Sequence, residues 1–424
     1  MHLIHENVVK NLLSLYTSDY KGLDTGSEDY ELEPDAVEAI GSACVAAGNT
    51  TPSAFGARVP NLATQRHYYT AESYTLFSTL LAPVVLRNRF SNAKYYKHFV
   101  ELVAIFNGCL RMSIGREYVD VVLRRQIVDW VQKFEKYFYQ YKPHRLSTCV
   151  LTIHALLHIP DNILNAGPMC MIKLRFGLRH ELDLSDRREE DCAGHTVNHY
   201  PGICVLRPHL RAAVIKPAVR KAIERYLLLS FEVDAAQAAT IIPEELSHWG
   251  KISFLNGGDK MRGTELFRYS EKNATQDASF VKVREFSLGP EQKLMYLQYS
   301  HEVDKNARYR NRPVQLERRV AYAQLLRVVE FRAELLVVTN DNGRITQQPK
   351  TLLLAVVRPV KIAQKSVRLG TPYYQDGQFA PVEVIDVDDL SCLVARIPDP
   401  ERGPKKWALC ERSDAMGVSE QALE

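Results

Sequence analysis

The sequence of 424 residues predicts an α+β fold, in which an N-terminal α-helical bundle is followed by a small β-barrel-like or open sandwich domain. Apolar residues recur at three- and four-residue spacing over about residues 70–170, which is the period of amphipathic helices. From residue 292 onward, short apolar runs alternate with turn residues, as in a series of short strands. Hydrophobic residues make up 46% and charged residues 25% of the chain, a globular composition that excludes disorder and an all-coiled-coil structure.

The same patterns divide the chain into five segments. We expect an acidic helical segment and linker at 1–60, an α-helical domain at 61–170, an irregular and helical connector at 171–290, a basic β-rich domain at 291–412 and a tail at 413–424.

Helices are expected where an apolar stripe repeats. The stripes lie at 2–16, 92–111, 114–139 and 146–164, and further helices are expected at 211–231 and 235–246. Thr70 precedes a helix start and is available as its N-cap.

Strands are expected in the last third of the chain. The candidates are 321–329, 333–339, 351–360, 382–387, 391–395 and 406–410. Residues 340–343, Asn-Asp-Asn-Gly, form a turn signal between two of them.

Several observations predict an intracellular protein that is not secreted and has no membrane partner. No run of 18 apolar residues occurs, and the first residues lack the pattern of a secretory signal. The eight cysteines are scattered, which is typical of a reducing compartment. If the protein acts on DNA, its location is the nucleus.

The overall net charge of +4 hides an uneven distribution. Residues 1–40 contain two lysines against nine carboxylates, a net charge of −7. Residues 301–370 contain fourteen Lys and Arg against six carboxylates, a net charge of +8. The basic segment favours a polyanion partner, and solvated faces of opposite sign are the alternative.

The densest basic cluster is the set of five arginines Arg308, Arg310, Arg312, Arg318 and Arg319, with Tyr309 among them. Arginine beside an aromatic residue suits phosphate contact combined with base stacking. We expect this cluster to contact nucleic acid, although an arginine-rich loop has the same composition.

Two patterns carry zinc-type ligands. Cys192, His195, His199 and Cys204 supply four Cys and His donors within thirteen residues, in an order unlike the common fingers. An irregular linker is the alternative for these residues. His154 and His158 lie one helical turn apart, but Ala155 occupies the place of a catalytic glutamate, so packing in a helical bundle is the alternative there.

The carboxylates Asp386, Asp388 and Asp389 could belong to a two-metal nuclease centre, and an acidic turn at a strand end is the alternative. No phosphate-binding loop and no nucleophile elbow occurs in the sequence. We therefore predict no catalytic residues, no enzyme activity, no small-molecule substrate and no cofactor, with zinc kept as the alternative.

Several motifs resemble the transposase-associated region of proteins encoded by fungal CACTA-type DNA transposons. The most specific lie at 89–100, 130–136, 145–149 and 152–158, and others lie at 54–61, 242–246, 249–251, 257–262, 307–312, 384–387 and 392–396. The resemblance covers about residues 35–412.

This resemblance implies a helical domain of unknown function and a β-rich tail that follow the catalytic domain of a transposase. The RNase H-like domain with the metal-binding carboxylates would lie upstream of this chain. After residue 169 the chain departs from the family pattern, which suggests an internal deletion. The resemblance therefore implies a non-catalytic, transposon-derived protein that binds DNA or a protein partner. The alternatives are a metal-dependent nuclease or hydrolase remnant and a genomic passenger without a selected function.

Overall fold

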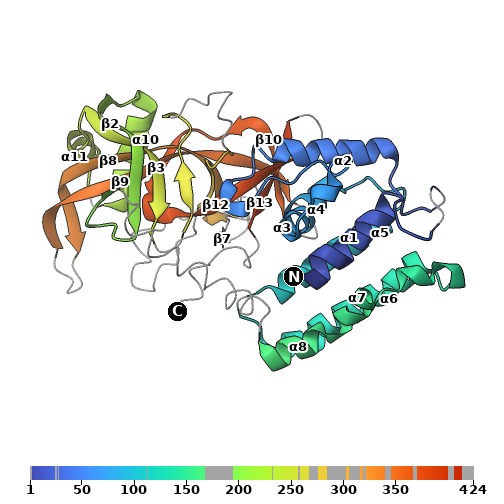
Figure 1. The fold of residues 1–424 in the computed structure, drawn as a ribbon. Helices are drawn as coiled ribbons and strands as arrows, with labels where there is room; N and C mark the ends of the chain where they lie inside the picture. Colours follow the sequence, from blue (N-terminus) through green and yellow to red (C-terminus); the bar gives the residue numbers. More distant parts are fainter. Residues whose placement is uncertain are drawn as a thin grey trace, which may run out of the picture. The chain divides into compact units, whose positions relative to one another are not determined.

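The structure is a computed structural model and is shown in Figure 1. It describes residues 2–23, 26, 28–111, 113–167, 194–231, 233–255, 258–266, 276–283, 302–304, 316–318, 321–339, 345–365, 370–399 and 405–412. The chain divides into two compact units. Unit 1 comprises residues 1–191, 362–376 and 395–424, and unit 2 comprises residues 192–361 and 377–394.

The N-terminal part of unit 1 is helical. Its segments are η1 (His2–Val9), α1 (Lys10–Tyr16), α2 (Pro34–Ala47), η2 (Ser53–Phe55), η3 (Arg66–Tyr68), α3 (Ala71–Leu76), η4 (Phe77–Leu81), α4 (Ala82–Val85), α5 (Ala93–Cys109), η5 (Tyr118–Leu123), α6 (Arg124–Phe134), η6 (Glu135–Tyr139), η7 (Pro143–Thr148), α7 (Leu151–Ala155), η8 (Leu156–His158) and α8 (Ile159–Ala166). The helical segments predicted at 2–16, 92–111, 114–139 and 146–164 are therefore observed, although shorter turns interrupt the first and the last two.

The predicted N-cap at Thr70 is confirmed, because its hydroxyl accepts a hydrogen bond from the backbone N–H of Ser73 at 3.2 Å. Asn92 caps α5 in the same way, accepting from Lys94 N at 3.0 Å. Both side chains satisfy backbone donors that the first helical turn leaves free. Local sequence thus fixes where these two helices begin.

A reciprocal pair of hydrogen bonds joins α5 to α6. Trp130 Nε1 donates to the carbonyl oxygen of His98 at 2.9 Å, and His98 Nε2 donates to that of Trp130 at 3.1 Å. The two rings are stacked with centroids 4.4 Å apart. Both side chains are buried, and burial lowers the pKa of His98 to about 3. His98 is therefore a neutral core residue at physiological pH.

The buried guanidinium of Arg145 connects three parts of unit 1. It donates to the carbonyl oxygen of Phe138 at 2.6 Å, to Glu28 Oε1 at 2.8 Å and to the hydroxyl of Tyr30 at 2.6 Å. Its side chain is 4% exposed. All three of its nitrogen atoms are satisfied, which is the condition for burying an arginine at acceptable cost.

The C-terminal segments of unit 1 supply strand β13 (Lys406–Glu411) and most of β10 (Pro372–Phe379). The two strands pair antiparallel, with Tyr374 opposite Trp407. Strand β10 was not predicted from the sequence. Its run of two tyrosines followed by polar residues and Gly377 lacks the apolar alternation that marks a half-buried strand.

Unit 2 is built on a large antiparallel sheet. The remaining strands are β1 (His195–Thr196), β2 (Ile203–Val214), β3 (Glu245–Phe254), β4 (Lys260–Arg262), β5 (Phe280–Val283), β6 (Glu302–Asp304), β7 (Leu316–Arg318), β8 (Ala321–Thr339), β9 (Ile345–Lys365), β11 (Glu383–Asp386) and β12 (Leu390–Pro398). Strands β1, β2, β3 and β8 are successive neighbours, β4 also pairs with β3, and β6 pairs only with β7. Strand β8 also pairs with β5 and with β9. Strand β5 pairs in turn with β12, and β9 pairs with β11.

Two helices, α10 (Pro217–Ser230) and α11 (Ala235–Ile241), lie against this sheet (Figure 1). Ile223 and Leu227 of α10 form one apolar cluster with Leu246, Val329 and Leu354 of three strands. Pro217 occupies the first turn of α10, where a missing N–H is tolerated. Both expected helices are thus observed. The helix expected at 211–231 begins later, at Pro217, and the helix expected at 235–246 ends earlier, at Ile241.

The expected small β-barrel-like or open sandwich domain is instead a large antiparallel sheet, to which eleven strands of the described residues belong. Strands also begin far earlier than residue 291, since β2 and β3 lie within the expected connector. The predicted strands 321–329 and 333–339 are one continuous strand, β8. The predicted turn at 340–343 lies outside the described residues, although Thr339 and Ile345 on either side pair with each other.

The predicted boundaries at residues 60, 170 and 290 stay predictions. Within unit 1, residues before and after position 60 are in direct contact, for example His5 Nδ1 and Ser78 Oγ at 3.1 Å.

Among the helices in the described part of the chain, none combines the length and apolar character that crossing a membrane requires.

Candidate functional site

A cluster of aromatic and charged side chains lies on one face of the unit 2 sheet. We call it the ring cluster and define it as His195, His209, Trp249 and Glu330. Residues on a strand alternate between faces. Leu246 and Val329 belong to the cluster packed on α10 and α11, so Trp249 and Glu330 point to the opposite face.

Sheet register brings the ring cluster together. His209 on β2 lies opposite Trp249 on β3, and Glu330 on β8 lies opposite Ser247, two residues before Trp249. His195 comes from the short strand β1, which pairs with the start of β2. Four strands therefore contribute one residue each.

The rings of both histidines are stacked nearly parallel to the indole ring of Trp249. The His209 and Trp249 ring centroids are 3.7 Å apart and those of His195 and Trp249 are 5.3 Å apart, each pair with an interplanar angle of 5°. Glu330 fixes two of these rings, because its Oε1 accepts from His195 Nε2 at 2.8 Å and its Oε2 from Trp249 Nε1 at 2.7 Å. Both carboxylate oxygens are thus occupied, and the ring orientations are set before any ligand arrives.

The imidazole of His209 is half-buried within the ring cluster. Burial lowers its pKa, the Glu330 carboxylate opposes that shift, and Arg211, His195 and Arg207 reinforce it. Its Nε2 is shielded from solvent and has no hydrogen-bond partner among the described residues. The imidazole of His209 is therefore held neutral against the indole face.

Two arginines of β2 flank the rings. Arg207 and Arg211 are exposed and line, together with the ring cluster and Ser247, an open cavity of about 480 Å³. Neither guanidinium makes a hydrogen bond or ion pair within the described part of the chain. Chemically, the site offers a flat aromatic surface beside two uncommitted cations.

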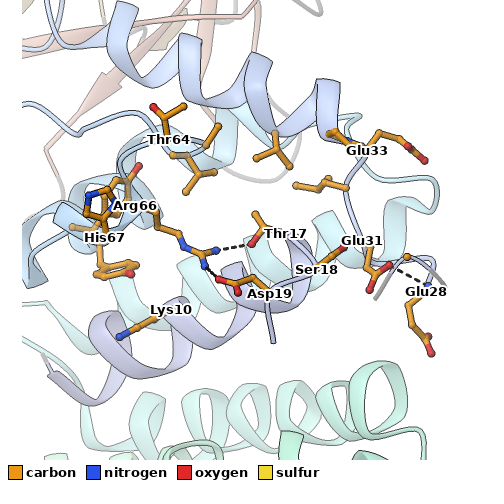
Figure 2. A pocket seen from close by; sticks show the side chains of 18 of the residues that line it. Lys10, Thr17, Ser18, Asp19, Glu28, Glu31, Glu33, Thr64, Arg66 and His67 are labelled. Carbon is orange, nitrogen blue, oxygen red and sulfur yellow. Dashed lines mark hydrogen bonds and ion pairs between the residues drawn. The ribbon is translucent and has the colours of Figure 1, made fainter. Parts of the chain in front are cut away.

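A larger cavity, of about 1290 Å³, lies in unit 1 between η1, α1, α2 and η3 (Figure 2). Figure 2 shows Arg66 reaching across it to the hydroxyl of Thr17 and the carboxylate of Asp19. At the other end, Glu31 accepts from the backbone N–H of Glu28.

Several charged groups around this cavity bind one another. Asp19 is paired with Arg66, and Glu28 is paired with Arg145 and also accepts from Gln140 Nε2 at 2.7 Å. The acidic first forty residues therefore place two of their carboxylates against cations of the same unit. Carboxylates, among them Glu31 and Glu33, line this cavity, whereas the cavity beside the ring cluster combines stacked rings with two arginines.

The predicted zinc row is only partly described. Cys192 lies outside the described residues, His195 is bonded to Glu330, His199 is exposed, and the Cys204 thiol is buried within β2. Among the residues that the structure describes, no group of three or more His, Cys, Asp or Glu side chains is arranged to hold a metal ion. Zinc at this row stays an untested alternative to the prediction of no cofactor.

His154 and His158 are exposed, and their Nε2 atoms lie 3.3 Å apart. The turn between them changes from α7 to the tighter η8. Nothing in the described residues adds a third ligand to this pair.

Asp386 is engaged inside unit 2. Its Oδ2 accepts hydrogen bonds from the hydroxyls of Tyr200 at 2.9 Å and Tyr226 at 3.1 Å, and its Oδ1 accepts from Asp388 N at 3.0 Å. Asp386 thereby caps η10 (Val387–Asp389), which contains Asp388 and Asp389. This arrangement supports the acidic turn, the alternative to a nuclease centre.

The basic cluster falls largely outside the described residues, which exclude Arg308, Arg310, Arg312 and Arg319. Arg318 is the last residue of β7, opposite Glu302 on β6. Its expected contact with nucleic acid therefore stays a prediction.

Of the ring cluster, sequence reasoning singled out only His195, and for a metal. A usable signal was present at residues 245–254, where Leu246, His248 and Ile252 alternate with Ser247 and Trp249 in the manner of a strand.

Comparisons of the chain with models of protein families, with curated proteins and with solved structures found no match.

Proposed function

We propose that this chain is a non-catalytic, transposon-derived protein that binds DNA in the nucleus, with an N-terminal helical bundle and a nucleic-acid-binding β-rich part. The observation that carries the proposal is the pair of uncommitted guanidinium groups, Arg207 and Arg211, beside the stacked rings of the ring cluster. Guanidinium groups bind phosphate, and aromatic rings stack on bases.

The charge distribution supports the same conclusion. The segment 301–370, of which residues 301–361 belong to unit 2, has a net charge of +8, and its arginines Arg308, Arg310 and Arg312 alternate with aromatic or polar residues. Phosphate contacts of this kind supply sequence-independent affinity. No observation favours the nuclease or hydrolase alternative, because both carboxylate oxygens of Asp386 accept hydrogen bonds within unit 2.

The test is the salt dependence of binding. Full-length protein is titrated against a labelled DNA duplex in a mobility-shift assay between 50 and 200 mM salt, and we expect affinity to fall steeply as salt rises. The triple substitution Arg308→Ala, Arg310→Ala and Arg312→Ala should reduce the slope of log K against log salt by roughly 2.7, which is about 0.9 for each lost phosphate contact.

A matched control removes three positive charges from unit 1, by the substitutions Arg116→Ala, Arg125→Ala and Lys136→Ala on exposed helical positions. The control should leave the slope unchanged. Binding that is absent, insensitive to salt or equally weakened by both triple variants contradicts the proposal.

A further inference from the structure

We propose that the ring cluster is a binding site for an unpaired nucleotide of a DNA strand, with the base stacked on the rings and the flanking phosphates held by Arg207 and Arg211. This inference rests on the proposed function, and it adds that the protein prefers single-stranded to duplex DNA.

The first argument is the geometry of the stacking surface. The ring planes of His195 and His209 each lie within 5° of the plane of Trp249, so a further planar ring can continue the same stack. The indole of Trp249 is 8% exposed, whereas the side chain of His195 is 45% exposed and accessible to a ligand. Glu330 holds both of these rings, so little conformational entropy is lost when a base binds.

The second argument is the placement of charge. Arg207 and Arg211 are four residues apart on β2, which separates them by about 13 Å along a fully extended strand. Two cations this far apart can each meet a different phosphate of a polynucleotide, whereas a mononucleotide offers one phosphate only. Glu330 is the one carboxylate that lines the cavity, and both of its oxygens are turned towards His195 and Trp249, from which they accept hydrogen bonds.

The third argument is that the site needs an accessible base. A cavity of about 480 Å³ lies within the size range of sites for small molecules, so it accommodates one nucleotide and not a duplex. In a duplex the base faces are stacked on one another and unavailable to the rings. Stacking on aromatic side chains is the common feature of proteins that bind single strands without sequence preference.

The experiment uses the full-length chain and tryptophan fluorescence. The protein is titrated with a fifteen-nucleotide oligodeoxyadenylate, with a duplex of the same length, and with adenosine monophosphate. We expect the single strand to bind about tenfold more tightly than either other ligand and to quench fluorescence. The chain has three tryptophans, and Trp249→Phe should remove the quenching that stacking on the ring cluster causes.

The charge contribution is tested with a double variant and a matched control. Arg207→Ala with Arg211→Ala should weaken single-strand binding about tenfold. Lys221→Ala with Arg225→Ala removes two exposed charges from α10 on the other side of the same sheet and should leave binding unchanged. All four side chains are exposed, so neither variant is expected to disturb folding.

The outcomes separate the two proposals. If the chain binds duplex and single strand equally, or if the β2 variant behaves as the α10 variant does, the ring-cluster site is wrong while DNA binding stands. Equal affinity for adenosine monophosphate also overturns the strand site. If no DNA binds at any salt concentration, the proposed function itself fails.

Discussion

Replacing Arg145 with methionine tests whether its buried hydrogen bonds hold unit 1 together. The guanidinium donates three hydrogen bonds, to Phe138, Glu28 and Tyr30, at 2.6 to 2.8 Å, and its side chain is 4% exposed. Removing one partner of a buried charged network costs about 3 to 5 kcal/mol, because it leaves the other groups unsatisfied. Glu28 is 19% exposed and keeps its hydrogen bond from Gln140 in the variant. We therefore expect a loss of folding free energy at the lower end of this range, about 3 kcal/mol.

Hydrogen exchange is the appropriate assay, since a chain with two units need not unfold in one step. Amides of α5 and α6 that exchange by opening of unit 1 should exchange about 150-fold faster in Arg145→Met, which is the rate ratio for about 3 kcal/mol at 1.4 kcal/mol per tenfold. The control Arg125→Met changes an arginine that is 84% exposed, and it should leave exchange unaltered. Equal protection in the two variants would refute the reasoning.

Two further outcomes are expected. The folded-state pKa of His98 is about 3, below its ordinary value of 6.5, so unit 1 should lose about 1.4 kcal/mol of stability per pH unit as pH falls from 6.5 towards 3. Unfolding monitored at several pH values should show this slope, and His98→Gln should abolish it. Asp386→Asn should destabilise unit 2 by about 2 kcal/mol, because the hydroxyls of Tyr200 and Tyr226 lose an ionised acceptor. Denaturation curves with a change below 0.5 kcal/mol would contradict that role.

The parts of the fold that were predictable from sequence are those governed by local chemistry. The helix at 93–109 follows from an apolar stripe and from Asn92, which caps it. The strand at 203–214 was missed because Arg207, Pro208 and Arg211 interrupt its apolar run, and two register shifts break its alternation. The short, separate apolar runs of this region predict short strands and therefore a small domain. In the structure, β8 and β9 extend over 19 and 21 residues.

The candidate site was not predictable for a different physical reason. Trp249 and Glu330 are 81 residues apart in sequence, and His195 and Glu330 are 135 apart. The pairing of β3 with β8 places Trp249 beside Glu330, and the pairings of β1 with β2 and of β2 with β3 bring His195 to the same carboxylate. No spacing rule within one element describes such a site, so His195 alone suggested a metal ligand and not part of an aromatic stack.

The pairing of β3 with β8 also sets an order of events during synthesis of the chain. Residues 247–249 of β3 pair with residues 328–330 of β8, which are translated about 80 residues later. At 5 to 20 residues per second, the ribosome takes roughly 4 to 16 seconds to cover that interval. During this time the backbone groups at that edge of β3 have no strand partner, and an open edge is where other chains pair. The open edge of β3 is therefore a site where nascent chains can associate, and we expect translation speed between β3 and β8 to influence how much protein folds.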